Sequence, residues 1–208
     1  MKRAINLEAF LWSSGVAFVL LSAVAGAGWL YAIDVSGTRA VQTYTSSQLD
    51  SISGLFSILG SWEITGALWL VLVTVLFLSR RRRLARRLLF AFIATGLLEY
   101  LLKMYLPVPP ILQETVRSKE FAPLTVLELP YPYPSGHVLR SAILLGTIYL
   151  LSENRFLRTG SAIVLLGMIV SRVYLGVHWT SDVLGGALLG LAAVSWTFMK
   201  EGSEWRSP

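Results

Sequence analysis

The chain has no cysteine, only two histidines and few charged residues, since Asp, Glu, Lys and Arg together make up 14% of it. The absence of cysteine excludes a disulfide framework, a thiol nucleophile and a thiolate metal site. An ordinary soluble domain carries about 25% charged residues, so this chain has too few of them to cover a water-facing surface. The same shortage excludes a disordered chain, a coiled coil and a DNA-binding domain.

Apolar residues are abundant instead and are gathered in long runs. Hydrophobic residues make up 54% of the 208 positions, and the mean hydropathy is +0.62. A helix needs about 20 apolar residues to cross the roughly 30 Å hydrocarbon core of a bilayer. We therefore predict an all-α, polytopic membrane helix bundle, with the whole chain, 1–208, forming one integral membrane domain. Six predicted transmembrane helices cover residues 10–33, 64–78, 84–106, 138–151, 156–175 and 183–199.

The first of these runs also has features of a cleaved secretory signal. Ala23, Ala25 and Ala27 resemble a small-residue cleavage region. The apolar core of the run is longer than the roughly 7–15 residues of a signal peptide, so we expect a retained span.

Basic residues are distributed unevenly about the predicted spans. If the six spans alternate in direction, twelve of the 18 Lys and Arg residues fall on one side of the membrane. These are Lys2, Arg3, Arg80, Arg81, Arg82, Arg83, Arg86, Arg87, Arg155, Arg158, Lys200 and Arg206. By the positive-inside rule that side is the cytoplasm, and both termini lie on it. The arginine run could instead bind nucleic acid or anionic lipids, but a role in topology is the simpler interpretation, and we expect no nucleic-acid partner.

The other basic residues lie on or near the opposite side, against this bias. They are Arg39, Lys103, Arg117, Lys119, Arg140 and Arg172. Charges at span ends or inside a span are costly and usually functional. With alternating spans, the same outer interface also receives Ser135 and both histidines, His137 and His178.

The two histidines are suited to nucleophilic and acid–base chemistry. His178 and Asp182 are four residues apart and therefore share one face of a helix. A carboxylate bonded to one imidazole nitrogen fixes the tautomer and makes the other nitrogen a better nucleophile. His137 titrates near neutral pH and would serve as a general acid and base. The plainer alternatives are two interfacial histidines and a helix-capping Asp182.

The start of the fourth predicted span favours phosphate binding. Ser135 can cap that helix, whose free N–H groups suit an anion, and Gly136 lets the anion approach the backbone. Arg172 offers a bidentate fork that matches phosphate geometry. Alternatively, Ser135 is only a cap, Arg172 and Lys103 snorkel to the interface, and Glu99 pairs with Lys103 one turn away. No zinc-type, paired-carboxylate or Gly-rich phosphate motif is evident, so we expect neither a metal nor another cofactor.

Two motifs, taken together, resemble those of a known family. The run Pro134-Ser135-Gly136-His137 is followed by Ser171-Arg172-x5-His178-x3-Asp182. In this order the motifs resemble the type-2 phosphatidic acid phosphatase superfamily, and the resemblance covers residues from about 99 to 200. Six spans match the membrane-embedded members of that family.

The resemblance implies metal-independent phosphate hydrolysis through a phosphohistidine intermediate. His178 would then be the nucleophile, Asp182 its orienting partner and His137 the acid and base. The phosphate would be held by Lys103, Ser135, Gly136 and Arg172.

The chain departs from the family at its first motif, a Lys followed seven positions later by Arg-Pro. Seven positions after Lys103 stands Pro110, so that phosphate-binding arginine is missing. We prefer Arg140 as its replacement, because it lies one turn inside the fourth predicted span without an obvious partner. Arg117, in the outer loop, is the alternative.

These features predict a lipid-phosphate phosphatase in the cell membrane, with its site on the extracytoplasmic side. Undecaprenyl pyrophosphate, phosphatidic acid and phosphatidylglycerophosphate all fit, and the sequence does not choose among them. A catalytically silent lipid-phosphate binder and a small membrane transporter stay open as alternatives, while a vanadate-dependent haloperoxidase is disfavoured by the six spans. Gly186 and Gly190 form a small-xxx-small pair that allows close helix contact, and the oligomeric state is left open.

Overall fold

The computed structural model describes residues 6–117 and 129–199, and these residues form eight α-helices, one short 3₁₀ helix and no strand. The helices are α1 (Leu7–Gly26), α2 (Tyr31–Val41), α3 (Ser47–Leu59), α4 (Trp62–Leu78), α5 (Arg82–Tyr105), α6 (Gly136–Leu151), α7 (Arg155–Tyr174) and α8 (Thr180–Phe198), with η1 (Gln113–Thr115) after α5. The predicted all-α membrane fold is confirmed. Lys2, Arg3, Lys119, Lys200 and Arg206 of the charge count lie outside the described residues.

Each predicted span corresponds to a helix, although not all of these helices are long. By length and composition, α1, α5, α7 and α8 could each cross a membrane, and α3 with α4 could form one further span that is bent by 48°. The remaining apolar helix, α6, has 16 residues. The number of six spans therefore stays a prediction.

Two helices near the start of the chain, α2 and α3, were not expected. The apolar run at 10–33 does not form one helix, because α1 ends at Gly26 and the backbone turns at Gly28, whose φ of +75° favours glycine. After that turn α2 begins at Tyr31. Ser46 then caps α3, its side-chain oxygen accepting a hydrogen bond from the Leu49 N–H at 3.2 Å.

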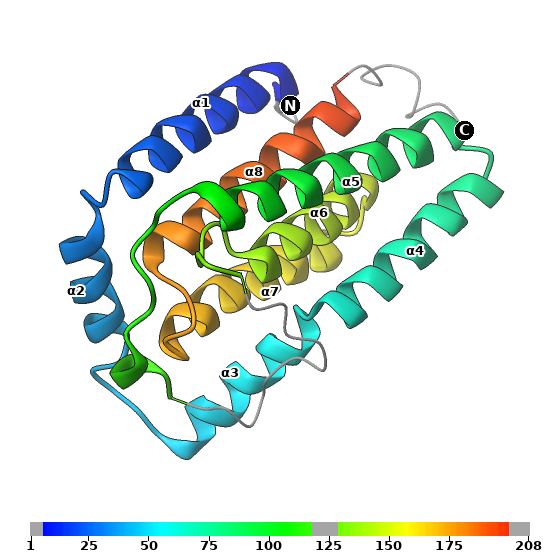
Figure 1. Ribbon diagram of the computed structural model, residues 1–208. Helices are drawn as coiled ribbons and strands as arrows, with labels where there is room; N and C mark the ends of the chain where they lie inside the picture. Colours follow the sequence, from blue (N-terminus) through cyan, green and yellow to red (C-terminus); the bar gives the residue numbers. More distant parts are fainter. Residues whose placement is uncertain (1–5, 118–128, 200–208) are drawn as a thin grey trace.

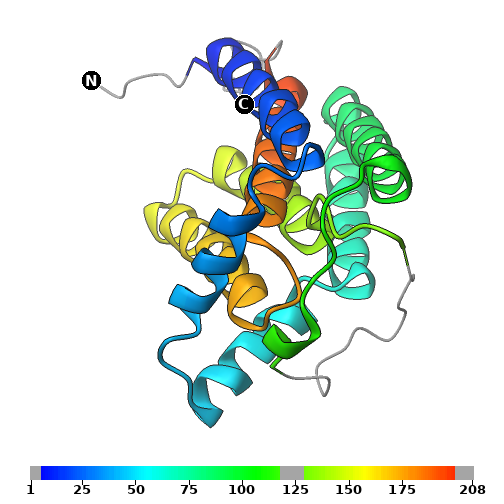
Figure 2. The ribbon, with the colours of Figure 1, turned by 60° about the vertical axis from the view of Figure 1, so that its left-hand side comes forward.

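Helix α8 lies at the centre of the bundle. It packs against α1, α5 and α6, while α4 and α5 form an antiparallel pair along one flank (Figure 1). The first turn of α1, the α4–α5 turn and the last turn of α8 lie at one end of the bundle (Figures 1 and 2). Helices α2 and α3 lie at the other end, which is also where α6 and α8 begin.

Close packing of α6 on α8 depends on two glycines. A Cβ on Gly186 would lie 2.4 Å from the Ser135 carbonyl oxygen, and one on Gly190 would lie 2.6 Å from the Ala142 Cβ. Lipid tails are as apolar as leucine, so membrane helices associate largely through such close van der Waals contact. The small-xxx-small pair therefore serves the contact between α6 and α8 within the bundle.

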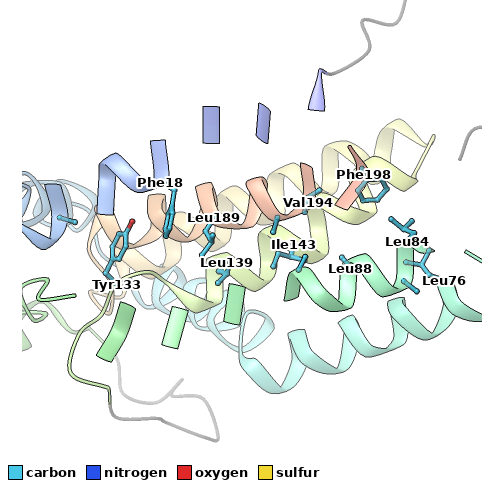
Figure 3. Packing of buried hydrophobic residues seen from close by; sticks show 14 of the residues in the cluster. Phe18, Leu76, Leu84, Leu88, Tyr133, Leu139, Ile143, Leu189, Val194 and Phe198 are labelled. Carbon is cyan, nitrogen blue, oxygen red and sulfur yellow. The ribbon is translucent and has the colours of Figure 1, made fainter. Parts of the chain in front are cut away.

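A continuous apolar cluster fills the space around α8 from one end to the other (Figure 3). It extends from Phe18 and Tyr133 near the start of α8 to Leu84 and Phe198 near its end. The Tyr133 hydroxyl also contacts the Ser22 hydroxyl at 2.9 Å, so the segment preceding α6 is attached to α1. This packing holds the beginnings of α6 and α8 beside each other.

Candidate active site

His178 and Asp182 form a hydrogen-bonded pair at the beginning of α8. His178 lies in the turn between α7 and α8, and its Nδ1 is 3.3 Å from Asp182 Oδ2. The same oxygen accepts the Trp179 N–H at 2.9 Å, so Asp182 also caps the helix as the plainer alternative proposed. Both roles are met by one buried carboxylate. With Nδ1 held, the Nε2 of His178 is the nitrogen left to react.

The surroundings of His178 keep its imidazole neutral. Burial lowers the pKa of His178 well below its usual range, and the positive charges of Lys103, Arg172 and Arg140 lower it further. A neutral imidazole has the free lone pair that a nucleophile requires. These three cations come from three different helices, Lys103 from α5, Arg172 from α7 and Arg140 from α6.

His137, in the first turn of α6, presents one nitrogen without a partner. Its ring hydrogen-bonds to the backbone of Ser57 in α3, while Nε2 has no hydrogen-bond partner and is buried. The charge of His137 contributes to the lowered pKa of His178, which indicates that the two rings are near each other. Lys103, Arg172 and His137 all act electrostatically on His178, whereas the roles predicted for these residues stay a prediction.

Arg172 and Lys103 approach the site from the last turns of α7 and α5. The Arg172 side chain is buried and donates from Nη1 to the Ser57 hydroxyl at 2.6 Å, whereas its Nε has no partner. Lys103 Nζ lies 3.7 Å from Glu99 Oε1, so the pairing that the one-turn spacing suggests is present. A buried guanidinium with an unused donor is suited to receive an anion.

Ser135 does not cap α6 as the sequence suggested. It occupies the N-cap position, but its side chain makes no capping hydrogen bond, and its buried Oγ has no partner. Its backbone N–H instead donates to the Asp182 carbonyl at 2.9 Å, which joins the beginnings of α6 and α8. The free hydroxyl is consistent with ligand binding and not with a plain cap.

Gly136 leaves room for an anion, as expected, and the carboxylate of Glu99 fills that room. A Cβ at this position would lie 2.0 Å from Glu99 Oε1 and 2.8 Å from Arg140 Nη1. Arg140 Nη1 is itself 3.0 Å from Glu99 Oε2. The expectation that Arg140 has no partner is therefore wrong, because α5 packs beside α6 and brings Glu99 to it.

Arg117 is engaged away from the two histidines. Its Nε lies 3.0 Å from Asp50 Oδ1, and its guanidinium lies 5.4 Å from the centre of the Tyr174 ring. Of the two replacements considered for the missing arginine, Arg140 is the one whose charge acts on His178 within the described residues.

No group of three or more His, Asp or Glu residues within 6–117 and 129–199 is arranged to hold a metal ion. The site instead combines two imidazoles, three cations and unused hydroxyl and guanidinium donors, a set that suits a phosphoryl group.

Comparison with known proteins agrees with this chemistry. A family model, that of the PAP2 superfamily, matches residues 84–203. This chain belongs to the PAP2 superfamily. The resemblance seen in the two motifs is thereby confirmed, and the matched region contains every site residue that the motifs predicted.

Two relatives of this PAP2 chain cover most of its length. One is phosphatidylglycerophosphatase B of Bacillus subtilis (strain 168), which is 29% identical over 185 residues, or 84% of this chain and 86% of the relative. The other is the crystal structure of a transmembrane PAP2-type phosphatidylglycerolphosphate phosphatase from Bacillus subtilis, with a TM-score of 0.69 and 23% identity over 90% of this chain and 93% of that one. The structural match shows that the fold is shared.

Two residues outside the PAP2 match support the site and were missed in the sequence. Ser57 contacts both Arg172 and His137, and Asp34 accepts the Ser181 N–H at 2.8 Å and the Ser181 hydroxyl at 2.7 Å. Burial raises the pKa of the Asp34 carboxyl, although the Ser181 donors oppose that effect. The one available sequence signal was Asp34 itself, a lone charge directly after an apolar run.

Proposed function

We propose that this protein hydrolyses the phosphate ester of a membrane lipid, without a metal, through a phosphohistidine on His178. Membership of the PAP2 superfamily supports lipid phosphatase activity. The observation that carries the finer mechanism is the gathering of His178, His137 Nε2 and the unused donors of Ser135 and Arg172 at the beginnings of α6 and α8.

In the first half of the proposed reaction, His178 Nε2 attacks the phosphorus atom. The P–N bond forms as the bond from phosphorus to the lipid oxygen breaks. His137, which is protonated once the negative phosphate is bound beside it, donates the Nε2 proton to that oxygen, so that the lipid leaves as an alcohol. Asp182 stabilises the positive charge on the His178 ring through Nδ1. Arg172 and the Ser135 hydroxyl bind the phosphoryl oxygens, and the positive charges of Lys103 and Arg140, which are paired with Glu99, stabilise the negative charge from a greater distance.

In the second half, water replaces the histidine. His137, now neutral, takes a proton from the attacking water while the P–N bond breaks, which restores His178 and releases inorganic phosphate. The protons balance over the two halves, because His137 returns to its starting state.

Phosphatidylglycerophosphate is the substrate that we favour. The relative with 29% identity is named as a phosphatidylglycerophosphatase, and the aligned region covers 84% of this chain. Undecaprenyl pyrophosphate and phosphatidic acid are the other candidates. We place the site at the extracytoplasmic interface, where the phosphate stays at the head-group level and the lipid tails stay in the bilayer.

Phosphate release by the purified protein in detergent, with EDTA present, tests this function. The wild type should release phosphate from phosphatidylglycerophosphate, phosphatidic acid or undecaprenyl pyrophosphate, and most rapidly from the first. His178→Ala should reduce release by a factor of about 10⁴ or more, because no phosphohistidine can form. An unchanged elution profile and melting temperature would show that this variant is folded.

Equal release by wild type and His178→Ala would contradict the proposed mechanism. The second candidate, a lipid-phosphate binder without turnover, is favoured by the missing arginine after Lys103. It would be supported instead if the wild type bound these lipids and released no phosphate from any of them.

A further inference from the structure

Within residues 6–117 and 129–199, the site contains two places that suit an anion, one open and one filled by a side chain. The open place is defined by the partnerless Ser135 Oγ, His137 Nε2 and Arg172 Nε, beside His178. All three side chains are at least nine-tenths buried, so their unused polar atoms are costly unless a ligand satisfies them. This is the place where the proposed function puts the phosphoryl group that is transferred.

The second place is filled by the protein itself. The Glu99 carboxylate lies between two cations, with Oε1 at 3.7 Å from Lys103 Nζ and Oε2 at 3.0 Å from Arg140 Nη1. It also lies against the beginning of α6, where Gly136 has no Cβ to exclude it. A carboxylate surrounded by two cations and a helix N-terminus has the same kind of environment as a bound phosphate.

The occupied place changes which substrates fit. A lipid monophosphate carries one phosphoryl group, which the open place accommodates. A lipid diphosphate would place its terminal phosphoryl beside His178 and needs further cations for the inner phosphate, yet Lys103 and Arg140 are already paired with Glu99. Repulsion between Glu99 and the inner phosphate would oppose binding in this partly buried site.

We propose that Glu99 is a specificity-determining residue that restricts this protein to lipids with a single phosphoryl group. This inference rests on the proposed function and narrows its substrate class to lipid monophosphates. Glu99 discriminates against lipid diphosphates in two ways. It pairs with the two cations that a second phosphate would require, and it fills the volume beside Gly136 that this phosphate would occupy.

The test compares the monophosphate and the diphosphate of one polyprenol, assayed with wild type, Glu99→Gln and Glu99→Ala. The wild type should have the higher kcat/KM for the monophosphate. Glu99→Gln removes the charge and keeps the volume, and Glu99→Ala removes both. We expect the diphosphate-to-monophosphate ratio of kcat/KM to rise about tenfold or more in at least one variant, because Lys103 and Arg140 become available.

Glu114→Gln is the matched control. Glu114 is exposed and pairs with Arg39, so this substitution should leave the ratio unchanged.

Thermal stabilisation by inorganic phosphate and by pyrophosphate provides a measurement that needs no turnover. Pyrophosphate should stabilise the wild type no more than phosphate does and should stabilise Glu99→Ala more. If the wild type releases phosphate from neither lipid, the proposed function fails, and this binding comparison still tests Glu99. The inference on Glu99 is overturned if pyrophosphate is already the better ligand of the wild type, or if neither variant changes the preference between the two ligands.

Discussion

At the scale of single residues, Ser57 connects two parts of the site. Its hydroxyl accepts a hydrogen bond from Arg172 at 2.6 Å, and its backbone holds the His137 ring. Only the first contact depends on the serine side chain. Replacing the Ser57 side chain should therefore remove the hydrogen bond to Arg172 and keep the backbone hydrogen bond to His137.

Ser57→Ala should lower kcat/KM for the lipid phosphate by about 10- to 100-fold, since hydrogen bonds to charged groups contribute about 1.5–3 kcal/mol. Most of the change should appear as a higher KM, because Arg172 holds the phosphate in the ground state as well as in the transition state. Steady-state kinetics in detergent would measure both constants.

Ser53→Ala is the matched control for that substitution. Ser53 is buried on the same helix one turn earlier, so its replacement removes the same atoms from α3. Identical kinetics for the two variants would show that Ser57 does not position Arg172.

At the scale of elements, a short helix outside the family match supports the beginning of α8. Asp34, in the first turn of α2, is buried and accepts two hydrogen bonds from Ser181, which directly precedes Asp182. The N–H groups at a helix start have no partner within the helix, so a carboxylate brought from another element is favourable there. Docking of α2 therefore stabilises the turn that carries His178 and Asp182.

The raised pKa of Asp34 predicts a pH dependence of stability. A carboxyl whose pKa is raised by folding binds its proton more tightly in the folded state, so its contribution is fully present below the unfolded pKa and is lost as pH rises through the folded value. The melting temperature of wild type minus that of Asp34→Asn should therefore decrease from about pH 4 upward. Thermal unfolding in detergent over a pH series would measure this difference.

Asp34→Ala is the control for that series, because it removes the acceptor as well as the titrating group. It should melt below wild type throughout, since the buried Ser181 donors lose their partner at a cost of about 1–3 kcal/mol. A difference between wild type and Asp34→Asn that is constant or grows with pH would contradict the prediction.

At the scale of the whole molecule, the two ends of the bundle differ in character. One end carries the arginine run of the α4–α5 turn, and the other carries the candidate site with α2 and α3. Between them, large apolar side chains such as Val16, Leu70, Phe90 and Leu166 are exposed, as expected for surfaces that face lipid. The positive-inside rule predicts that the arginine-rich end lies in the cytoplasm, which would place the site on the outer face.

This orientation can be tested with single cysteines, because the natural chain contains none. Tyr44→Cys, in the exposed turn between α2 and α3, should react with a membrane-impermeant maleimide on intact cells. Ser79→Cys in the α4–α5 turn and Glu153→Cys in the α6–α7 turn should react only after permeabilisation. Labelling of Tyr44→Cys and Ser79→Cys from the same side would contradict the proposed arrangement.

Local patterns in the sequence predicted the long apolar helices and the contact between His178 and Asp182, but not the short helices α2 and α3. Apolar runs predict membrane helices because the bilayer requires each segment to satisfy its own backbone hydrogen bonds. The spacing of His178 and Asp182 predicts their contact, although His178 makes it from the turn before α8 and not from the same helix face. The two motifs together also indicated the family, which the comparison confirmed.

The partners of the remaining charges were decided only by the tertiary structure. Glu99 reaches Arg140 across 41 positions of sequence, Ser57 reaches Arg172 across 115, and Asp34 reaches Ser181 across 147. No helical period relates such distant residues, because their contact depends on how α2, α3 and α5 pack against α6, α7 and α8. The chemical groups and the long apolar helices could therefore be predicted from the sequence, whereas the packing of the helices pairs Glu99 with Lys103 and Arg140 and pairs Arg117 with Asp50.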